Sequence, residues 1–372
     1  SNTTIAAGSL NSSAYNQSRT WSNDASGGSY DGGQGIANAF NGNTTGSSKV
    51  AAAYPGSTTI TFSPAISGST IEFLYGKTPS TGLFTINGTE EMPATASATS
   101  YVWNTSSATT VSSVTINHTG TGASFWVAMK VDGKLLVDYG VSVTNVPSIA
   151  STARTSASSG FSIVSYTGTG AAATIAHNLN AKPEFYIVKR RDGTISWCVY
   201  HSAMAATKYL FLDGSAAVDT SSTVWNNTEP TSSVFSVGTY GGVSANSGEY
   251  IGFFFSPVEG FSSVGSYLGN GSTDGPFVYT GFKVAWILIR PLSGGNWAII
   301  DTARDPDNGA GRLLLPNDNS AEIDFSSSYP NDILSNGFKV RNAGGQTNTN
   351  GQEHIYLAFA SNPFASNGGL AR

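Results

Sequence analysis

The sequence is poor in charged residues. Only 11% of its 372 residues are Asp, Glu, Lys or Arg, against roughly 25% in an average soluble protein. The formal net charge is −5, whereas a partner with a phosphate backbone requires clustered Lys and Arg. We therefore expect no nucleic-acid partner.

Cysteine and long apolar runs are also lacking. Cys198 is the single cysteine, so neither an internal disulfide nor a thiolate metal site can form. Its apolar surroundings predict a buried, inert thiol. A protein without disulfides can gain stability by assembly, and we expect a homo-oligomer. No apolar run reaches the roughly 18 residues that a membrane span needs, so we expect no membrane insertion.

Recognisable catalytic motifs are missing as well. His118, His177, His201 and His354 are the four histidines, and none has a second ligand at metal-binding spacing. The sequence contains neither a G-x-S-x-G nucleophile elbow nor a P-loop. We expect no enzymatic activity, no catalytic residues and no cofactor.

Glycine, small polar residues and aromatics take the place of the missing charges. The chain has 43 Gly, and hydrophobic residues make up 39% of it and aromatics 11%. This is enough apolar material for packed cores. Abundant Thr, Ser, Val and aromatic residues favour strands joined by polar turns. The sequence predicts an all-β protein.

The C-terminal half contains a tandem duplication. Residues 165–170, Ser-Tyr-Thr-Gly-Thr-Gly, recur about a hundred residues later as Ser-Tyr-Leu-Gly-Asn-Gly at 266–271. Further landmarks follow both copies in the same order: apolar runs closed by Lys189 and Arg290, then Trp197 and Trp297, then closing strands that begin at Glu249 and Glu353. We predict two homologous β-sandwich repeats of jelly-roll type, repeat 1 at 161–261 and repeat 2 at 262–366. Because almost no residues separate them, they should pack as a rigid pair.

The N-terminal half shows short runs in which apolar and polar residues alternate, as in half-buried strands. We predict a β-sandwich over residues 15–146. Asp132-Gly133 between two apolar runs predicts a type I′ hairpin, and a short helical turn is expected at 36–40. We assign 1–14 to a connecting arm, 147–160 to a Ser/Ala/Thr-rich linker and 367–372 to a tail.

With these elements placed, a family resemblance appears. The duplicated module, with Ser-Tyr-x-Gly-x-Gly and Tyr-Ile-Gly-Phe-Phe-Phe-Ser-Pro-Val-Glu-Gly-Phe at 250–261, resembles a repeat of tail-fibre and other virion structural proteins of marine phages, cyanophages especially. The stretches at 37–42 and 125–141 resemble another module of cyanophage structural proteins, and the first of them, Ala-Asn-Ala-Phe-Asn-Gly, also echoes discoidin-like carbohydrate-binding sandwiches.

The resemblance implies a virion structural protein on the particle surface, most naturally a tail-fibre segment that attaches to host-surface polysaccharide. Its partners would be other virion proteins and further copies of itself, with a trimer favoured. A capsid decoration or fibre protein is the close alternative. A bacterial extracellular adhesin or filament subunit is a third interpretation, and a glycan depolymerase the competing enzyme class.

Glycan sites use aromatic faces that stack on sugar rings and amides that hold hydroxyls. Five aromatic residues lie in polar or Gly-rich surroundings: Trp21, Trp103, Trp225, Tyr240 and Tyr279. These aromatics and Asn226 are the candidate ligand-binding residues. Trp225 leads this set because repeat 2 has no equivalent tryptophan, which would free it from a shared packing role. Trp197 and Trp297, in contrast, should both lie in the cores of their repeats.

Two acidic patterns carry weaker expectations. Glu249 and Glu353 precede apolar strands, where a salt bridge is more natural than the carboxylate pair of a glycosidase. Asp305-Pro306-Asp307-Asn308-Gly309 resembles part of a calcium loop but lacks the distal Glu of an EF-hand. We interpret it as a turn, with structural calcium at Asp305, Asp307 and Asn308 as the alternative.

Overall fold

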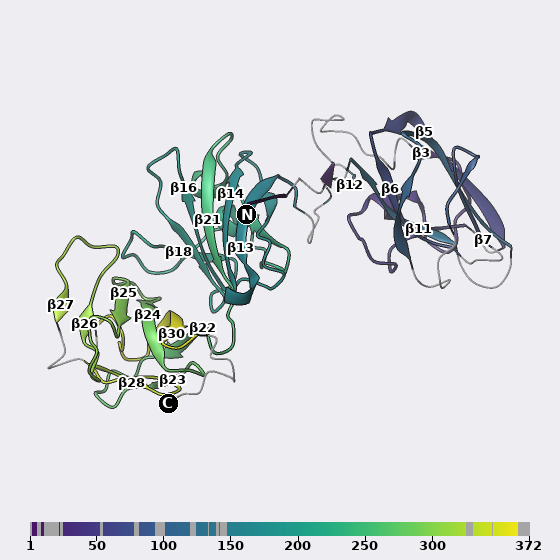
Figure 1. Cartoon of the computed structure of the whole chain (residues 1–372). Coiled ribbons are helices and arrows are strands. Elements are labelled where there is room, and N and C mark those ends of the chain that lie inside the picture. Colours follow the sequence, from purple (N-terminus) through teal and green to yellow (C-terminus); the bar gives the residue numbers. More distant parts are fainter. Residues whose placement is uncertain are drawn as a thin grey trace. The chain divides into compact units, whose positions relative to one another are not determined.

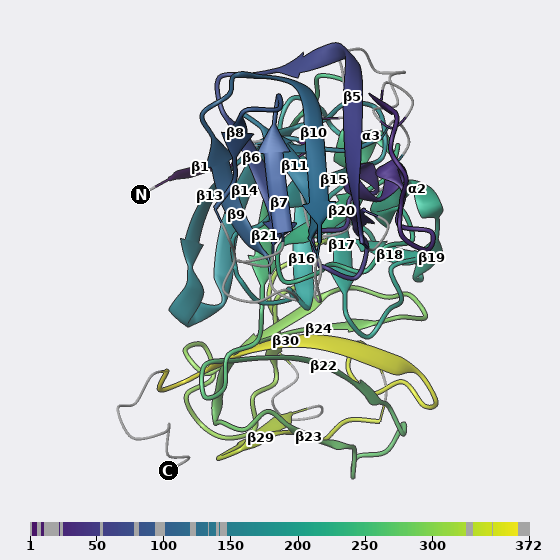
Figure 2. The ribbon, with the colours of Figure 1, turned by 90° about the vertical axis from the view of Figure 1, so that its right-hand side faces the viewer.

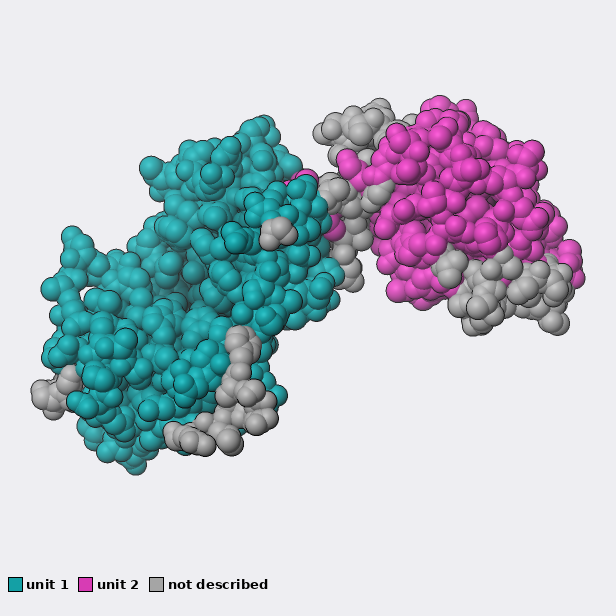
Figure 3. All heavy atoms as spheres, viewed as in Figure 1, with its two compact units in different colours: residues 1–5, 151–372 teal, residues 6–150 magenta. Residues whose placement is uncertain are grey.

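The computed structural model describes residues 2–5, 9–10, 22, 25–52, 55–77, 82–93, 101–119, 124–132, 134–138, 141, 147–324, 330–343 and 345–363. The chain folds as two compact units (Figure 3): unit 1 holds Ser1–Ile5 and Ser151–Arg372, and unit 2 holds Ala6–Ala150. Strands make up nearly all of the regular structure of the described residues and form several sheets, which confirms the predicted all-β class. None of the helices in these residues is long and apolar enough to cross a membrane.

Unit 2 is built from two sheets that share one core (Figure 1). The strand order in the first is β3 (Ala25–Ser26), β5 (Gly56–Ser67), β10 (Thr110–His118), β7 (Gly82–Ile86), β8 (Glu90–Glu91). The order in the second is β2 (Ser9–Leu10), β12 (Lys134–Leu136), β11 (Phe125–Val131), β6 (Ile71–Gly76), β9 (Val102–Ser106), with β4 (Val50–Ala51) paired to β11. In the core, Phe40 and Phe73 meet the Trp126 ring edge-on, with centroids 5.6 and 5.9 Å away.

The hairpin predicted at Asp132 is present. Val131 pairs with Lys134, which leaves a two-residue loop, and Asp132 has a φ of 50°, as the first loop residue of a type I′ turn requires. The Asp132 carboxylate accepts the backbone N–H groups of Ser69 at 2.7 Å and Thr70 at 2.9 Å. The helical turn expected at 36–40 is the 3₁₀ helix η1 (Ile36–Phe40). Both local predictions are confirmed.

Repeat 1 is organised around one large sheet in unit 1. Its order is β1 (Thr3–Ile5), β13 (Ser151–Ser156), β14 (Phe161–Thr167), β21 (Glu249–Phe255), β16 (Phe185–Arg190), β17 (Cys198–His201), β18 (Lys208–Phe211), β19 (Asp219–Thr220). Its inner face packs against a small sheet and two short helices: β15 (Ala173–Ala176), β20 (Val234–Val237), α2 (Ser222–Trp225) and α3 (Gly241–Ser244). The Phe235 ring of β20 joins the sheets, with centroids 4.5 Å from Phe254 and 5.7 Å from Tyr186.

Repeat 2 repeats this arrangement. Its large sheet has the order β22 (Ser262–Leu268), β30 (Glu353–Ala360), β24 (Val284–Pro291), β25 (Ala298–Asp301) (Figure 2). Its small sheets are β23 (Phe277–Tyr279), β29 (Gly337–Val340), β28 (Asn331–Leu334), and β26 (Arg312–Leu313) with β27 (Ile323–Asp324). The large-sheet order is that of β14, β21, β16 and β17 in repeat 1. The two segments therefore share one strand order, as a duplication requires.

The glycines of the Ser-Tyr-x-Gly-x-Gly motif explain why it recurs. A Cβ at Gly168 would lie 2.5 Å from the Ala245 carbonyl oxygen, and one at Gly269 would lie 2.4 Å from that of Thr349. The second glycine of each motif has a positive φ of 74° (170) or 61° (271), which side chains disfavour. The motif is a turn that the fold needs.

The outer faces of the two large sheets pack against each other. Their shared apolar core consists of Phe185, Val199, Met204 and Leu210 from repeat 1 and Leu288, Trp297, Ile355 and Leu357 from repeat 2. The Trp297 indole N–H donates to the Phe211 carbonyl oxygen at 2.9 Å, and the His201 Nε2 atom lies 3.2 Å from the Tyr356 carbonyl oxygen. The two repeats form one packed pair.

The assignments of the N-terminal arm and the linker need correction. β1 pairs with β13, with Ile5 opposite Ser151, so part of the expected arm and much of the expected linker are strands of unit 1. The buried positions of β13 carry small residues, Ser151 and Ala153, which leave no hydrophobic alternation to read. Unit 2 is therefore inserted in the chain between two adjacent strands of unit 1.

Candidate functional site

Trp225, the leading candidate from the sequence, lies in the core of repeat 1. Its side chain is 0% exposed and meets the Tyr186 ring edge-on at a centroid distance of 4.9 Å. The preceding Ser221 caps α2 by accepting the Thr223 N–H at 3.2 Å, and the short helix turns the indole inward. The prediction that Trp225 faces a ligand is therefore wrong. A residue that is present in one repeat only can still fill the core of that repeat.

The other candidates are scattered. Asn226 is exposed at the end of α2, in a left-handed conformation, and Trp103 is 40% exposed on β9 of unit 2, where the Lys130 ammonium lies 4.2 Å from its ring centroid. Trp21 lies outside the described residues. Tyr240 is half-buried beside the Phe211 ring, at a centroid distance of 6.4 Å. The structure does not bring the described candidates together into one site.

The expected core tryptophans differ from each other. Trp297 is 1% exposed, but it lies in the core shared by the two repeats and not in the core of repeat 2. Trp197 is half-buried and stacks on Phe253, at 6.5 Å between centroids. Cys198 is a buried free thiol, and burial raises its pKa to about 12. This agrees with the inert thiol that the sequence predicts.

The acidic patterns are engaged in the protein's own contacts. The Glu249 carboxylate lies 3.5 Å from the Arg191 guanidinium. In the suspected calcium loop, Asp305 accepts the backbone N–H groups of Gly311 and Arg312, and Asn308 accepts that of Ile333 at 2.8 Å. Among the described residues, no group of three or more His, Cys, Asp or Glu is placed to hold a metal. The turn interpretation fits this geometry.

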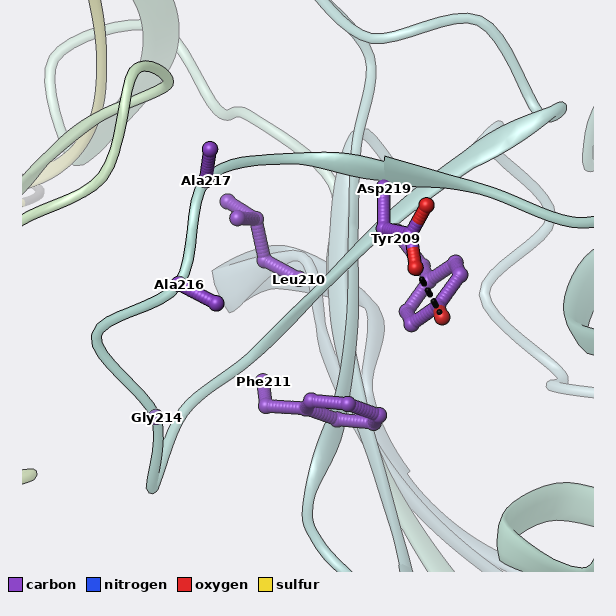
Figure 4. Close-up of a pocket in the computed structure, with 7 residues that line it drawn as sticks. All are labelled: Tyr209, Leu210, Phe211, Gly214, Ala216, Ala217 and Asp219. Carbon is purple, nitrogen blue, oxygen red and sulfur yellow. Dashed lines mark hydrogen bonds between the residues drawn. The ribbon is translucent and has the colours of Figure 1, made fainter.

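A small pocket of about 60 Å³ opens at the β18–β19 edge of the large sheet of repeat 1 (Figure 4). We call it the Tyr209 pocket; it is lined by Tyr209, Leu210, Phe211, Gly214, Ala216, Ala217 and Asp219. The volume is well below that of typical small-molecule sites, so the pocket suits one small group. The aromatic rings of Tyr209 and Phe211 are half-exposed at the pocket, and their centroids lie 5.2 Å apart.

A hydrogen bond sets the polar side of the pocket. Tyr209 and Asp219 are opposite each other on β18 and β19, and the Tyr209 hydroxyl donates to the Asp219 carboxylate at 2.9 Å (Figure 4). Partial burial, and then this bond, raise the pKa of Tyr209 to about 12, while the Thr220 backbone N–H lowers the pKa of Asp219. At neutral pH the pocket presents an ionised carboxylate with lone pairs left to accept hydroxyl groups.

Repeat 2 holds the loop that forms one wall of the pocket. Gly295 donates its N–H to the Ser215 carbonyl oxygen, and Val218 donates to that of Leu292, both at 2.9 Å. The Arg290 guanidinium, which is buried, donates to the Ala216 carbonyl oxygen. The pocket belongs to repeat 1 but its shape depends on the packed pair.

Tyr209 and Phe211 were not predicted from the sequence, although repeat 2 carries a different kind of residue at the equivalent positions. These aromatics occupy the places that Leu313 and Leu315 hold in repeat 2, where both leucines are buried. At equivalent positions, repeat 2 has buried aliphatic residues and repeat 1 has half-exposed aromatic residues. Core packing therefore does not account for the two aromatic side chains of repeat 1.

The fold and the site define a tandem all-β module with a small aromatic pocket. Residues 137–363 match DUF7483, a domain of unknown function, and the chain belongs to this family. The match spans both repeats and leaves out most of unit 2, so the packed pair is what the family shares. No curated protein and no solved structure matches the chain significantly.

Proposed function

We propose that the protein is a structural component of a phage particle, a tail-fibre segment on the particle surface that attaches to host-surface glycans. The Tyr209 pocket carries this proposal. Its two rings offer faces for a sugar ring, and Asp219 accepts sugar hydroxyls. The resemblance of both modules to phage structural proteins supplies the biological setting.

The Tyr209 pocket is better suited to binding a glycan than to cleaving it. The Tyr209 pocket has one carboxylate, Asp219, whereas glycoside hydrolysis by the common mechanism needs two, roughly 5 to 10 Å apart. Rigid strands hold both rings, so little entropy is lost when a sugar is bound. Weak sites of this size become useful when a fibre presents several copies, and a trimer would provide that avidity.

The duplication supplies a direct test of the pocket. Tyr209→Leu and Phe211→Leu install the residues that repeat 2 carries at these places, so the fold should accept them while the stacking faces are lost. Isothermal titration with polysaccharides from candidate hosts should show at least a tenfold loss of affinity. Trp103→Leu is the control for an exposed tryptophan elsewhere. A loss with Trp103→Leu, and none with the pocket variants, would move the site to unit 2.

The place on the particle needs a separate experiment. Gold-labelled antibody against the chain should mark the tail periphery in electron micrographs of purified phage. Label over the capsid would favour the decoration protein, and no label on particles would favour the bacterial adhesin. Light scattering tests the trimer. Release of reducing ends from the bound polysaccharide would contradict the non-enzymatic proposal.

A further inference from the structure

Repeat 2 carries two strongly exposed aromatic rings on one strand. Phe277 is 46% exposed and Tyr279 66% exposed, while Val278 between them is 5% exposed. Because side chains alternate along a strand, Val278 points into the core and both rings lie on the outer face of β23. We call this pair the β23 platform.

Repeat 1 shows that the fold does not require these rings. Val278 pairs with Phe338 as Ile175 pairs with Phe235, which aligns Phe277 with Thr174 and Tyr279 with Ala176. The equivalent strand thus folds with a threonine and an alanine. The aromatics of repeat 2 lie on an outward face, where they contribute little to packing and expose apolar surface to water.

The neighbouring strand keeps the platform open. Gly337 lies opposite Tyr279, so no side chain stands beside the Tyr279 ring on β29. A Cβ at Gly337 would lie 2.1 Å from the Val278 carbonyl oxygen and 3.1 Å from the Phe277 ring. The backbone therefore forbids a side chain at this place, and the outer surface next to the rings stays flat.

The charges around the platform are paired with each other. Lys339, opposite Phe277, lies 2.7 Å from the Asp274 carboxylate. Arg341 lies 3.7 Å from Asp332, the residue that pairs with Lys339 on β28. Among the described residues, these two ion pairs give the face both donors and acceptors of hydrogen bonds, and their charges balance. It therefore suits a neutral, hydroxyl-rich partner better than an anionic one.

We propose that the β23 platform is a second glycan-binding surface, which stacks on two neighbouring rings of a neutral polysaccharide chain. Residues two apart on a strand are separated by about 7 Å, so each aromatic can face a different sugar ring. Two rings are too little apolar area for a stable protein interface, which buries about 800 Å² per partner. The platform would take an extended chain, whereas the Tyr209 pocket takes a single group.

The test uses the full chain and the residues of repeat 1 as replacements. Affinity electrophoresis in gels that contain a neutral β-glucan, mannan or galactan should retard the wild-type protein in at least one of the three. The double variant Phe277→Thr/Tyr279→Ala should lose at least tenfold in affinity for that polysaccharide. Its thermal midpoint should stay near the wild-type value, since Thr174 and Ala176 serve the same strand in repeat 1.

The controls separate the two sites. Tyr209→Leu/Phe211→Leu should keep the platform-dependent retardation, so the pocket and the platform can fail independently. Equal retardation of the wild-type protein and the platform variant, or no retardation of the wild-type protein in any of the three gels, would overturn the proposal. A dimer seen by light scattering that disappears in the platform variant would also overturn it, because the face would then bind a second copy.

Discussion

Tyr166 and Tyr267 make the same hydrogen bond in the two repeats. The Tyr166 hydroxyl donates to the Val243 carbonyl oxygen and the Tyr267 hydroxyl to that of Thr347, each at 2.7 Å. Both tyrosines are buried, where a hydroxyl without a partner would be costly. This bond fastens the first strand of each repeat, β14 or β22, to the segment that precedes its closing strand.

The ring that stacks on each tyrosine differs between the two repeats, but the stacking geometry is nearly the same. Tyr166 stacks on Tyr250 at 5.0 Å and 14°, and Tyr267 stacks on His354 at 5.1 Å and 9°. A flat ring is what the position requires. The duplication therefore reveals which chemical property of a residue the fold depends on.

The motif glycines should be intolerant of a side chain. Gly168→Ala and Gly269→Ala each place a Cβ within about 2.5 Å of a carbonyl oxygen, and we expect each to lower the free energy of unfolding by about 1 to 3 kcal/mol. Gly35→Ala is the control, because its Cβ would meet nothing nearer than 4.0 Å. Urea denaturation measures all three, and equal midpoints would contradict the packing argument.

Trp225 should matter for stability and not for ligand binding. Trp225→Ala removes a fully buried ring and should cost about 3 to 5 kcal/mol, while Trp225→Phe should cost much less because an aromatic ring still fills the space. Calorimetric unfolding checks this order. Loss of glycan binding by a folded Trp225→Phe protein would restore the tryptophan as a ligand residue.

Unit 1 should lose stability in mild acid. Burial lowers the pKa of His177 and of His201 from 6.5 to about 4. In each ring Nδ1 accepts a backbone N–H, from Leu179 or Ala203, so a proton there would break a hydrogen bond. The unfolded chain takes up protons below about pH 6.5 and the folded protein does not, so stability is full above that pH and falls toward pH 4.

The slope of this acid effect can be measured. Each histidine should contribute on the order of 1 kcal/mol per pH unit between pH 6.5 and 4. Thermal midpoints recorded through this range should fall less steeply for His201→Asn than for the wild-type protein. Parallel curves would mean that His201 does not resist protonation in the folded state.

Arg290 should be replaceable by an apolar residue of similar length. Its side chain is 0% exposed, its Nε and Nη1 atoms have no hydrogen-bond partner among the described residues, and burial lowers its pKa to about 10. Removing a poorly compensated buried charge is often neutral or stabilising. Arg290→Met should therefore keep or raise the thermal midpoint, and a drop comparable to that of Trp225→Ala would contradict this.

Unit 1 should fold without unit 2. Because Ile5 lies opposite Ser151, joining these residues through Asn-Gly would convert β1 and β13 into a tight hairpin. The shortened chain should show cooperative unfolding and the acid sensitivity expected of His177 and His201. A protein that is unfolded at all pH values would show that unit 2 is needed for folding.

Turns and the duplication could be predicted from the sequence, but the burial of individual side chains could not. The Asp132 hairpin, the helical turn at 36–40 and the duplication follow from turn residues and spacing, which act over short distances. Trp225 and Tyr209 were misjudged or missed because burial depends on which segments meet across a fold. β13 escaped notice because small residues at its buried positions produce no hydrophobic pattern.

The contact between the repeats has a consequence for how such chains can lengthen. Equivalent surfaces meet in it: Val199 of repeat 1 and its counterpart Ile299 of repeat 2, on the outward sides of their sheets, lie in one shared core. A contact between two equivalent surfaces uses both of them and ends at a pair, whereas contacts between different surfaces can add further copies. A third copy would find no free face of this kind. The module is complete as a pair, so we expect such chains to lengthen by other domains, such as the one inserted between Ile5 and Ser151.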